Sequence, residues 1–293
     1  MDIIFGSSGF IGRNLAKYIF DKYGKNNLVR ISRSKGEVFK SKKNFYQIDL
    51  RYKRKLLNLS LKNINRVFIC SGISKTYIKK KSEGNKQIIN NRNILKNIII
   101  FCKKNNVKKI IFLSSSTVYS KINKHPLSEN QKIKPITFLG KSKKINENQL
   151  LKLSRTSKIK VLILRIFTVY GKGMRTDQFI TQIIKKIKKN KKVTLWNPNT
   201  FRNLIYIKDL NNIIDLLSKK SSKKFDIINV ASNKSFQIKY IFKILSGVLK
   251  KKRELSFSSN SNNFDHFVNI SKLKNKIKKF KFTKLEDGLR IIQ

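Results

Sequence analysis

Three glycines near the start of the chain have a spacing that suits phosphate binding. The segment Gly6-Ser7-Ser8-Gly9-Phe10-Ile11-Gly12 follows an apolar run and opens an amphipathic stretch. A strand that reverses tightly into a helix needs glycine in the turn, and the helix N-terminus then offers free N–H groups to a pyrophosphate. The pattern predicts a dinucleotide site, with a purely structural turn as the alternative. Its expected contacts are Gly6, Gly9, Phe10, Ile11 and Gly12.

The end of the second apolar run, residues 28–32, favours NADP over NAD. This run ends at Ser32 and is followed by Arg33. Dinucleotide folds usually place an acid here to hold the ribose hydroxyls, whereas a guanidinium forks onto a phosphate. A hydroxyl followed by Arg33 therefore suits a 2′-phosphate. In a chain this basic, a chance surface charge at Arg33 is the alternative.

Short β-branched runs alternate with amphipathic stretches along most of the chain, which indicates a doubly wound (Rossmann) α/β fold with a parallel sheet. Such a sheet binds ligands beyond the carboxyl ends of its strands. We expect residues 1–168 and 203–232 to form a dinucleotide-binding domain, and residues 169–202 and 233–293 to form a smaller C-terminal substrate-binding cap. The expected strands cover residues 2–5, 28–32, 44–50, 66–70, 109–114, 160–165, 203–207 and 225–230, and the expected helices cover 10–23, 90–104, 140–154, 176–189 and 236–249.

The net charge of +53, from 68 Lys and Arg against 15 Asp and Glu, has two possible origins. Thirteen of the basic residues are Arg, and the lysines are scattered beside abundant Asn and Ile, the residues that A/T-rich codons specify. A nucleic-acid binder would cluster its charge and favour Arg. Biased composition is therefore favoured over an adapted polyanion surface, although non-specific attraction of polyanions is expected at low salt.

Other composition features exclude several protein classes. A hydrophobic content of 40% is too high for a disordered polycation, and no apolar run is long enough to span a membrane. No signal peptide is apparent, and two cysteines make no disulfide framework, so a cytoplasmic protein is expected. Cys70 and Cys102 are expected to be buried apolar residues. His125 and His266 have no partners at ligand spacing, so no metal site is expected.

Beyond the glycine turn, the sequence resembles the extended short-chain dehydrogenase/reductase family of NAD-dependent sugar-nucleotide epimerases, dehydratases and reductases, nearly from end to end. The matching segments are Cys70-Ser71-Gly72, the spaced Asn91 and Asn97, Ser114-Ser115-Ser116-Thr117-Val118-Tyr119, Arg165-Ile166-Phe167-Thr168-Val169-Tyr170-Gly171, Arg202-Asn203-Leu204-Ile205-Tyr206-Ile207-Lys208-Asp209-Leu210 and Leu285-Glu286-Asp287-Gly288-Leu289-Arg290.

The resemblance implies a role for each matching position. Ser115 would hydrogen-bond the reacting oxygen, and Lys143 would hold the nicotinamide ribose. Thr168 stands where the family usually has Asn in its substrate site, and Arg202 would bind the substrate diphosphate. For Lys143 and Arg202, a plain surface role is the alternative. Asp209 is expected to cap the helix that follows it, with a ligand contact as the alternative. The remaining cofactor contacts would be Asp49, Leu50, Ser71 and Gly72.

The active-site segment, residues 135–147, matches the family pattern P-x-x-x-Y-G-x-S-K-x-x-x-E except that Leu139 stands at the tyrosine position. The family's tyrosine transfers the proton that accompanies hydride transfer, whereas leucine can neither donate nor accept a proton. Phe138 has no hydroxyl. Tyr119 has a counterpart that the family keeps beside its catalytic tyrosine, which indicates a structural role. A relay through Ser115 or water is the remaining repair.

The implied activity is NAD(P)-dependent 4-keto reduction or 4-epimerisation of a nucleoside-diphosphate sugar, in surface polysaccharide synthesis. Dehydration is disfavoured, because Ser116-Thr117 replaces the Asp-Glu pair of the dehydratases. The alternative is a catalytically lapsed dinucleotide-binding scaffold or RNA-binding protein of the same fold. Family members often dimerise through helices that correspond here to residues 86–105 and 140–154, so a homodimer is a further expectation.

Overall fold

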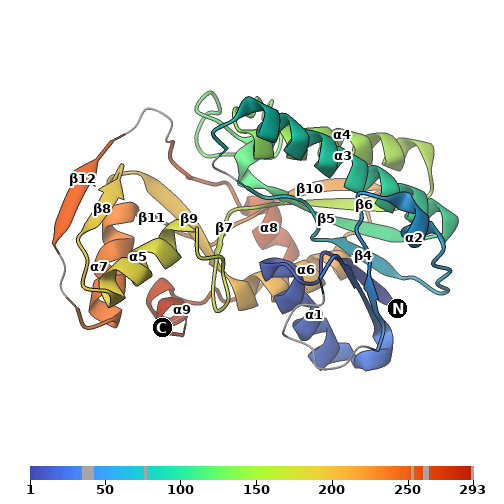
Figure 1. Ribbon diagram of the computed structural model, residues 1–293, viewed down its shortest axis with the longest axis horizontal. Coiled ribbons are helices and arrows are strands. Elements are labelled where there is room, and N and C mark those ends of the chain that lie inside the picture. The colour runs from blue at the N-terminus through green and yellow to red at the C-terminus, as the bar shows by residue number, and fades with distance from the viewer. Residues whose placement is uncertain (35–42, 76–77, 252–253, 260–263, 292–293) are drawn as a thin grey trace. The chain divides into compact units, whose positions relative to one another are not determined.

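A parallel sheet organises the first of two units into which the chain divides in the computed structural model (Figure 1). The structure describes residues 1–34, 43–75, 78–251, 254–259 and 264–291. The first unit contains Met1–Ser120, Lys132–Arg165 and Ile214–Ile228. The second contains Lys121–Gln131, Ile166–Ile213 and Asn229–Gln293.

The sheet of the first unit has seven strands in the order β10-β6-β5-β4-β1-β2-β3. The chain runs from β1 outward through β2 and β3, then returns to the other side of β1 for β4, so the order reverses at β1. The printed registers of β1 with β2 and β4, of β2 with β3, and of β4 with β5 are all parallel. A crevice forms at such a reversal, beyond the carboxyl ends of the strands. The strands are β1 (Asp2–Phe5), β2 (Leu28–Ser32), β3 (Phe45–Gln47), β4 (Arg66–Ile69), β5 (Lys109–Ser115), β6 (Lys160–Ile166) and β10 (Phe225–Val230).

Helices cover both faces of this sheet. Figure 1 shows α3 (Lys81–Lys104) and α4 (Phe138–Thr156) on one face and α1 (Phe10–Tyr23) on the other. The short α2 (Lys53–Leu57) packs against α3. Strands β1 and β4 are buried at every position, which explains the apolar residues that follow their first, charged residues, Asp2 and Arg66. Phe5 and Phe101 meet edge to face in the core, with ring centroids 5.6 Å apart.

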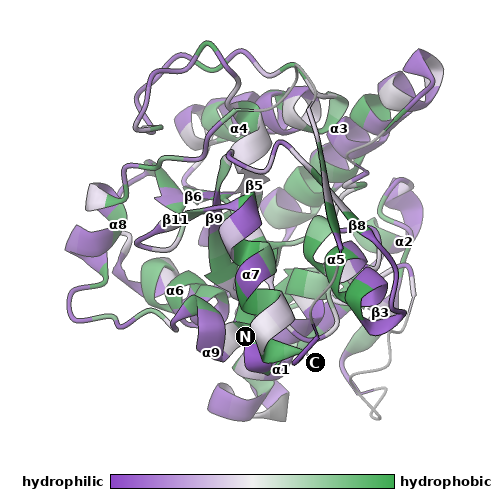
Figure 2. Cartoon of the chain, turned by 90° about the vertical axis from the view of Figure 1, so that its left-hand side faces the viewer, coloured by the Kyte–Doolittle hydropathy of each residue, from purple (hydrophilic) through white to green (hydrophobic). Residues whose placement is uncertain are grey.

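The second unit holds two small sheets and several helices. Its three-stranded sheet has the order β11-β9-β7, with β9 parallel to β7 and antiparallel to β11, and a second sheet pairs β8 with β12 in parallel. The amphipathic α7 carries both hydrophobic and hydrophilic stretches in Figure 2. The elements are β7 (Thr168–Tyr170), α5 (Phe179–Lys188), β8 (Val193–Trp196), β9 (Phe201–Tyr206), β11 (Ser235–Gln237), α7 (Ile238–Val248), β12 (Leu255–Ser258), α8 (Ser271–Lys276) and α9 (Leu285–Arg290), while α6 (Ile207–Lys220) contributes residues to both units.

The predicted fold class, a doubly wound parallel sheet flanked by helices, is confirmed. The helix expected at residues 90–104 begins nine residues earlier, at Lys81. The sequence did not reveal this start, because the first turns of the helix are polar and lack the apolar spacing of the rest. The strand expected at 44–50 is shortened to β3. Asp209 lies inside α6, and its carboxylate accepts hydrogen bonds from Thr283, so the expected cap was wrong. The predicted domain boundaries stay a prediction.

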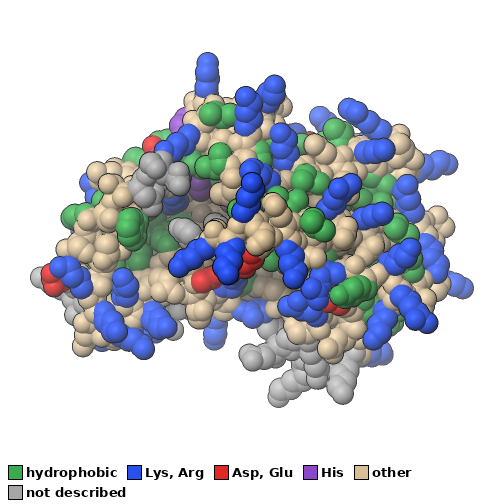
Figure 3. Space-filling view, turned by 45° about the horizontal axis from the view of Figure 1, so that its top comes forward, with side chains coloured by type: hydrophobic (Ala, Val, Ile, Leu, Met, Phe, Trp, Pro, Cys, Tyr) green, Lys and Arg blue, Asp and Glu red, His purple; other side chains and the backbone are tan. Residues whose placement is uncertain are grey.

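Basic side chains are spread over the surface. In Figure 3, Lys and Arg are scattered over the face drawn rather than gathered over one element, and acidic side chains are few. Among the described helices, none combines the length and apolar character that crossing a membrane requires.

Candidate functional site

The glycine turn joins β1 to α1 through contacts that leave no room for side chains. Gly6 has a φ of 82°, and a Cβ there would lie 2.6 Å from the Ser71 nitrogen. A Cβ on Gly12 would lie 2.1 Å from the Gly6 oxygen. Gly9 is the N-cap of α1, and no side chain caps this helix end. We call this turn, together with the first-turn backbone N–H groups of Phe10 and Ile11, the glycine cradle. No side chain caps these N–H groups, so they are available to a ligand.

Hydroxyl groups connect the turn to the end of β2. Ser7 Oγ donates to Ser32 Oγ at 3.4 Å, and both side chains are buried. Ser32 Oγ in turn donates to the Ser34 carbonyl oxygen at 2.6 Å. Arg33, next in sequence, is exposed. The expected adenosine end of the site thus has a fixed hydroxyl and an adjacent exposed guanidinium.

Asp49, which follows β3, is paired with Arg51. The guanidinium of Arg51 contacts both carboxylate oxygens, with Nη2 2.6 Å from Oδ2 and Nε 3.0 Å from Oδ1. The hydrogen bonds from Arg51 hold the pKa of Asp49 below its usual value, and the charge of Arg33 acts in the same direction. Leu50 is buried beside it. Asn97 on α3 donates to the Leu50 carbonyl oxygen at 3.0 Å and fixes this loop.

The loop after β4 offers an unused hydroxyl. Ser71 Oγ is buried and has no hydrogen-bond partner in the described part of the chain. Gly72 has a φ of 139°. Asn91 on α3 holds the next residue of the loop, since its Oδ1 accepts from the Ile73 nitrogen at 2.7 Å and its Nδ2 donates to the Ile73 oxygen at 3.0 Å. An orphaned buried hydroxyl beside the glycine cradle fits a ligand that supplies the missing partner.

Ser115 ends β5 with its acceptor capacity in use. Its Oγ accepts from the Thr117 backbone nitrogen at 3.2 Å and from Thr117 Oγ1 at 3.0 Å. A hydroxyl has two lone pairs and one proton, so the proton of Ser115 remains available to donate. The side chain is half-buried.

Lys143 is tethered to the same strand. Its Nζ donates to the Leu113 carbonyl oxygen at 2.7 Å and lies 4.6 Å from the centroid of the Phe112 ring. Burial lowers the pKa of Lys143 to about 8, against smaller opposing effects from Cys70 and Glu147. An ammonium with this pKa is still mostly protonated at pH 7 and can donate two further hydrogen bonds.

Leu139 lies in the first turn of α4, four residues before Lys143, and is only 7% exposed. Thr137 caps this helix by accepting from the Gly140 nitrogen at 3.0 Å. A Cβ on Gly140 would lie 2.1 Å from the Thr117 oxygen, so the helix start packs directly on the turn that follows β5. Because residues four apart share a helix face, Leu139 and Lys143 point the same way.

Tyr119 belongs to a buried network of charged side chains. Its hydroxyl accepts from Arg165 Nη1 at 3.0 Å, and the ring is 1% exposed. Arg165 Nη2 also donates to Glu147 Oε2 at 2.8 Å, and Ser114 Oγ donates to Glu147 Oε1 at 2.6 Å. These contacts tie α4 to β5 and β6. This pairing of Arg165 with Glu147 was not predicted, although both residues stand in the matched motifs.

Thr168 and Arg202 belong to the second unit. Thr168 starts β7, where it pairs in register with Leu204 of β9, and it is half-buried. Arg202 Nη1 donates to the Phe264 carbonyl oxygen at 2.7 Å. His266 is half-buried nearby, and desolvation of its ring, followed by the charge of Arg202, lowers its pKa to about 3. The structure thus brings the predicted cofactor and catalytic residues together in the first unit, and the two predicted substrate residues lie in the second.

The predicted cofactor residues fit a dinucleotide. The glycine cradle suits a pyrophosphate, because Gly6 and Gly12 carry no side chains that would fill it. The Ser71 hydroxyl has no hydrogen-bond partner among the described residues, and the Lys143 ammonium can donate two further hydrogen bonds. In the described ranges, no three His, Cys, Asp or Glu side chains are grouped so as to hold a metal ion. The burial that raises the pKa of Cys70 to about 12 keeps this thiol protonated.

Comparison with known proteins agrees with this geometry. Among curated proteins, the chain is 24% identical over 302 residues to an uncharacterized UDP-glucose epimerase, YtcB, of Bacillus subtilis, covering 98% of this chain and 95% of that one. It is 30% identical over 172 residues to a dTDP-4-dehydro-6-deoxyglucose reductase of Escherichia coli, covering 56% and 54% of the two chains. Among solved structures, UDP-glucuronic acid 4-epimerase of Bacillus cereus, in complex with UDP-glucuronic acid and NAD, superimposes with a TM-score of 0.86 at 22% identity, covering 99% of this chain and 97% of that one.

The family predicted from the sequence motifs is confirmed by a match to a protein-family model. The model of the NAD dependent epimerase/dehydratase family matches residues 3–231, which include the glycine turn, the end of β5 and the start of α4. The chain therefore belongs to the NAD dependent epimerase/dehydratase family.

Proposed function

We propose that the protein is an NAD(P)-dependent oxidoreductase or epimerase that acts at C4 of a nucleoside-diphosphate sugar. The observation that carries the proposal is the glycine turn after β1, which packs against Cys70 and Ser71 at the end of β4 and leads into α1, a helix without a side-chain cap. The names of the similar proteins, UDP-sugar epimerases and a dTDP-sugar reductase, point to the same substrate class.

The cofactor contacts that we propose are those of the first unit. When bound, the nicotinamide group would accept or donate a hydride. The helix start would hold the pyrophosphate, Ser71 would gain a hydrogen-bond partner, and Lys143 would donate to the nicotinamide ribose. The complete set is Gly6, Gly9, Phe10, Ile11, Gly12, Ser32, Arg33, Asp49, Leu50, Ser71, Gly72 and Lys143.

We favour NADP(H) over NAD(H) as the cofactor. The exposed Arg33 next to the fixed Ser32 hydroxyl supports a 2′-phosphate contact. Asp49 is already paired with Arg51 and is less available to a ribose hydroxyl. Arg33→Ala is therefore expected to weaken NADPH binding about tenfold or more and to change NADH binding little, because a lost charge-assisted contact is worth about 1.5–3 kcal/mol.

At the reacting carbon, the residues that we propose as catalytic are Ser115 and Lys143. The Ser115 proton is free to donate to the sugar C4 oxygen, since the lone pairs of its Oγ face Thr117. Arg202 would hold the diphosphate and Thr168 the sugar. Leu139 leaves no side-chain acid at the tyrosine position, so we propose that Ser115, directly or through water, moves the proton in a slower reaction.

Turnover assays test this function. The purified protein is supplied with UDP-glucose or UDP-glucuronic acid together with NAD+ or NADP+, which can accept the C4 hydride. A dTDP-4-keto-6-deoxy sugar is supplied with NADPH or NADH, which can donate one, and products are separated by chromatography. We expect slow conversion of at least one sugar, abolished in Ser115→Ala and retained in the nearby Ser116→Ala. No conversion of any sugar, together with normal dinucleotide binding, would contradict the enzymatic proposal.

A second candidate function rests on Leu139. A member that keeps the dinucleotide site but lacks the proton donor can serve as a scaffold or RNA-binding protein. RNA binding that persists at high salt would favour this candidate, because counterion-driven attraction to a chain of charge +53 weakens with salt.

We further propose a cytoplasmic homodimer that works in surface polysaccharide synthesis. Both cysteines are free, which suits a reducing compartment. Ile89 and Ile100 on α3 are 58% and 36% exposed, and their spacing of eleven residues places them on one face of the helix. That face, with α4, is the proposed dimer contact. The high positive charge spread over the surface would also attract polyanions non-specifically.

A further inference from the structure

A cavity lies at the edge of the central sheet opposite the glycine turn. It has a volume of about 880 Å³ and is lined in part by Arg66, Lys109 and Lys160, the first residues of β4, β5 and β6. Ser115 lies six residues beyond Lys109 in β5, so the two edges are about 20 Å apart at 3.3 Å per residue. The cavity is therefore separate from the proposed dinucleotide site.

The lining of this cavity is more basic than the chain as a whole. Seven of its 14 lining residues are Lys or Arg and none is acidic, whereas Lys and Arg make up 68 of the 293 residues of the chain. Biased composition accounts for scattered lysines but not for this enrichment. The basic lining residues are Arg66, Lys103, Lys108, Lys109, Lys158, Lys160 and Lys219.

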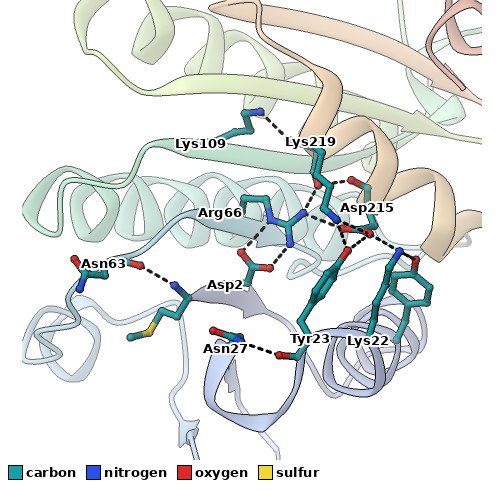
Figure 4. A network of polar contacts seen from close by, with 12 residues as sticks. Asp2, Lys22, Tyr23, Asn27, Asn63, Arg66, Lys109, Asp215 and Lys219 are labelled. Carbon is teal, nitrogen blue, oxygen red and sulfur yellow. Dashed lines mark hydrogen bonds and ion pairs between the residues drawn. The ribbon is translucent and has the colours of Figure 1, made fainter.

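A buried network fixes the wall of the cavity (Figure 4). Arg66 Nε donates to Asp2 Oδ1 at 3.0 Å, and its Nη1 donates to Asp215 Oδ1 at 2.9 Å and to Ser218 Oγ at 2.7 Å. Lys219 Nζ lies 3.7 Å from Asp215 Oδ2. These two acids are satisfied by the charges of the wall, so they leave the remaining lysines uncompensated.

Lys109 is a half-buried cation within this group. Its Nζ donates to the Ser218 and Ser221 carbonyl oxygens, each at 2.7 Å, which aims the ammonium at a fixed point (Figure 4). Burial, followed by the charges of Lys160 and Arg66, lowers the pKa of Lys109. Burial and the neighbouring positive charges thus disfavour the protonated form of Lys109. A bound anion would offset this repulsion.

Four exposed lysines surround the opening. Lys103 lies in the last turn of α3, Lys108 precedes β5, Lys158 precedes β6 and Lys160 is the first residue of β6. None of the four forms an ion pair within the described portion of the chain. They come from separate segments and approach one cavity, whereas Val107 and Ile159 supply buried apolar lining between them.

We propose that this cavity binds a small polyphosphate, the chemical class that includes nucleoside di- and triphosphates. Its volume is in the range of small-molecule sites. Several ammonium groups converging on one cavity match a compact ligand with adjacent phosphates better than an extended nucleic-acid backbone, which needs a stripe of charge.

Calorimetric titration of the full chain with sodium tripolyphosphate, at physiological salt, tests the proposal. The variant Lys108→Gln/Lys158→Gln/Lys160→Gln removes three rim charges. The matched control Lys53→Gln/Lys55→Gln/Lys185→Gln removes three exposed charges from α2 and α5, outside the cavity. Circular dichroism and thermal unfolding verify that both variants fold. A parallel titration with ATP shows whether a nucleoside adds affinity over the phosphates alone.

The expected result is saturable binding by the wild type, weakened at least about tenfold in the rim variant and less than about twofold in the control, because charge attraction falls off with distance. Equal weakening in both variants would identify non-specific attraction and overturn the proposal. Unchanged affinity in the rim variant would place the anion elsewhere, the glycine turn included, and would also overturn it. Rim-dependent binding of single-stranded RNA without saturable tripolyphosphate binding would replace the proposed ligand by a nucleic acid.

Discussion

Replacing Leu139 by tyrosine is expected to restore the missing proton donor. The side chain at position 139 is 7% exposed at the start of α4 and shares a helix face with Lys143. A tyrosine hydroxyl there would lie within the influence of the Lys143 ammonium, which lowers the pKa of a neighbouring phenol. Leu139→Tyr is therefore expected to raise turnover about 100- to 10,000-fold, the usual contribution of a positioned general acid or base.

The pH dependence of this gain follows from Lys143. Burial lowers the pKa of Lys143 to about 8, so about nine tenths of the side chains are charged at pH 7. The ammonium is lost as the pH rises through about 8. The gain in turnover is accordingly expected to be largest below about pH 8 and to decline above it.

Leu139→Phe is the matched control, because it adds the ring without the hydroxyl. Steady-state assays on the same sugar compare the wild type with both variants after dinucleotide titration has shown that each binds the cofactor. We expect Leu139→Phe to stay within about threefold of the wild type, since it supplies no acid or base. The reasoning is refuted if the tyrosine variant is no faster than the phenylalanine variant.

Three further predictions concern the stability of the fold. Glu147→Gln breaks the buried pair with Arg165 and is expected to lower the free energy of unfolding in urea by about 3–5 kcal/mol; the control Glu83→Gln, in an exposed pair with Lys75, should cost less than about 1 kcal/mol, and equal costs would contradict the prediction. Gly12→Ala places a Cβ 2.1 Å from the Gly6 oxygen and should cost about 1–3 kcal/mol, whereas Gly247→Ala, with open space around it inside α7, should stabilise by about 0.5–1 kcal/mol; a stable Gly12→Ala would show that the turn is less tight than described. Burial is the main cause that lowers the pKa of His266 to about 3. Between about pH 6.5 and pH 3, the unfolded chain therefore binds a proton at His266 and the folded chain does not. The free energy of unfolding should accordingly fall by about 1.4 kcal/mol per pH unit as the pH is lowered through this range. His266→Phe should lack this part of the decline, and identical pH dependence of the two proteins would contradict the assignment.

Local features of the fold were readable from the sequence. The first strand, first helix and second strand have the predicted bounds, because apolar runs and the glycine turn mark each end. The start of α3 was missed because its first turns are polar. These turns pack at Gly84 against the Phe138 ring, which would lie 2.5 Å from a Cβ at this position. That contact joins residues 54 positions apart, which no local pattern records.

Long-range polar pairs were equally beyond the sequence. Arg66 meets Asp2 and Asp215 across separations of 64 and 149 residues, and Arg165 meets Glu147 across 18. Which of the 68 basic side chains pairs with a buried acid depends on the order of the strands in the sheet, and no local sequence pattern records that order. In the candidate site, motif spacing identified Ser115 and Lys143, whereas the orphaned Ser71 hydroxyl and the pairing of Asp49 with Arg51 emerged only from the structure.

The central claim, that the glycine turn holds a dinucleotide, is tested most directly by titrating the protein with NADPH and comparing it with Gly9→Asp. Gly9 is the N-cap of α1, with a φ of −69°, and a Cβ there meets nothing closer than 3.4 Å. Aspartate is a favourable N-cap residue, so the variant should fold at least as well as the wild type, while its carboxylate repels the pyrophosphate. We predict saturable NADPH binding by the wild type and at least about tenfold weaker binding by Gly9→Asp, at an unchanged or higher unfolding temperature. Equal NADPH affinity in both proteins, or no binding by the folded wild type, would contradict the claim.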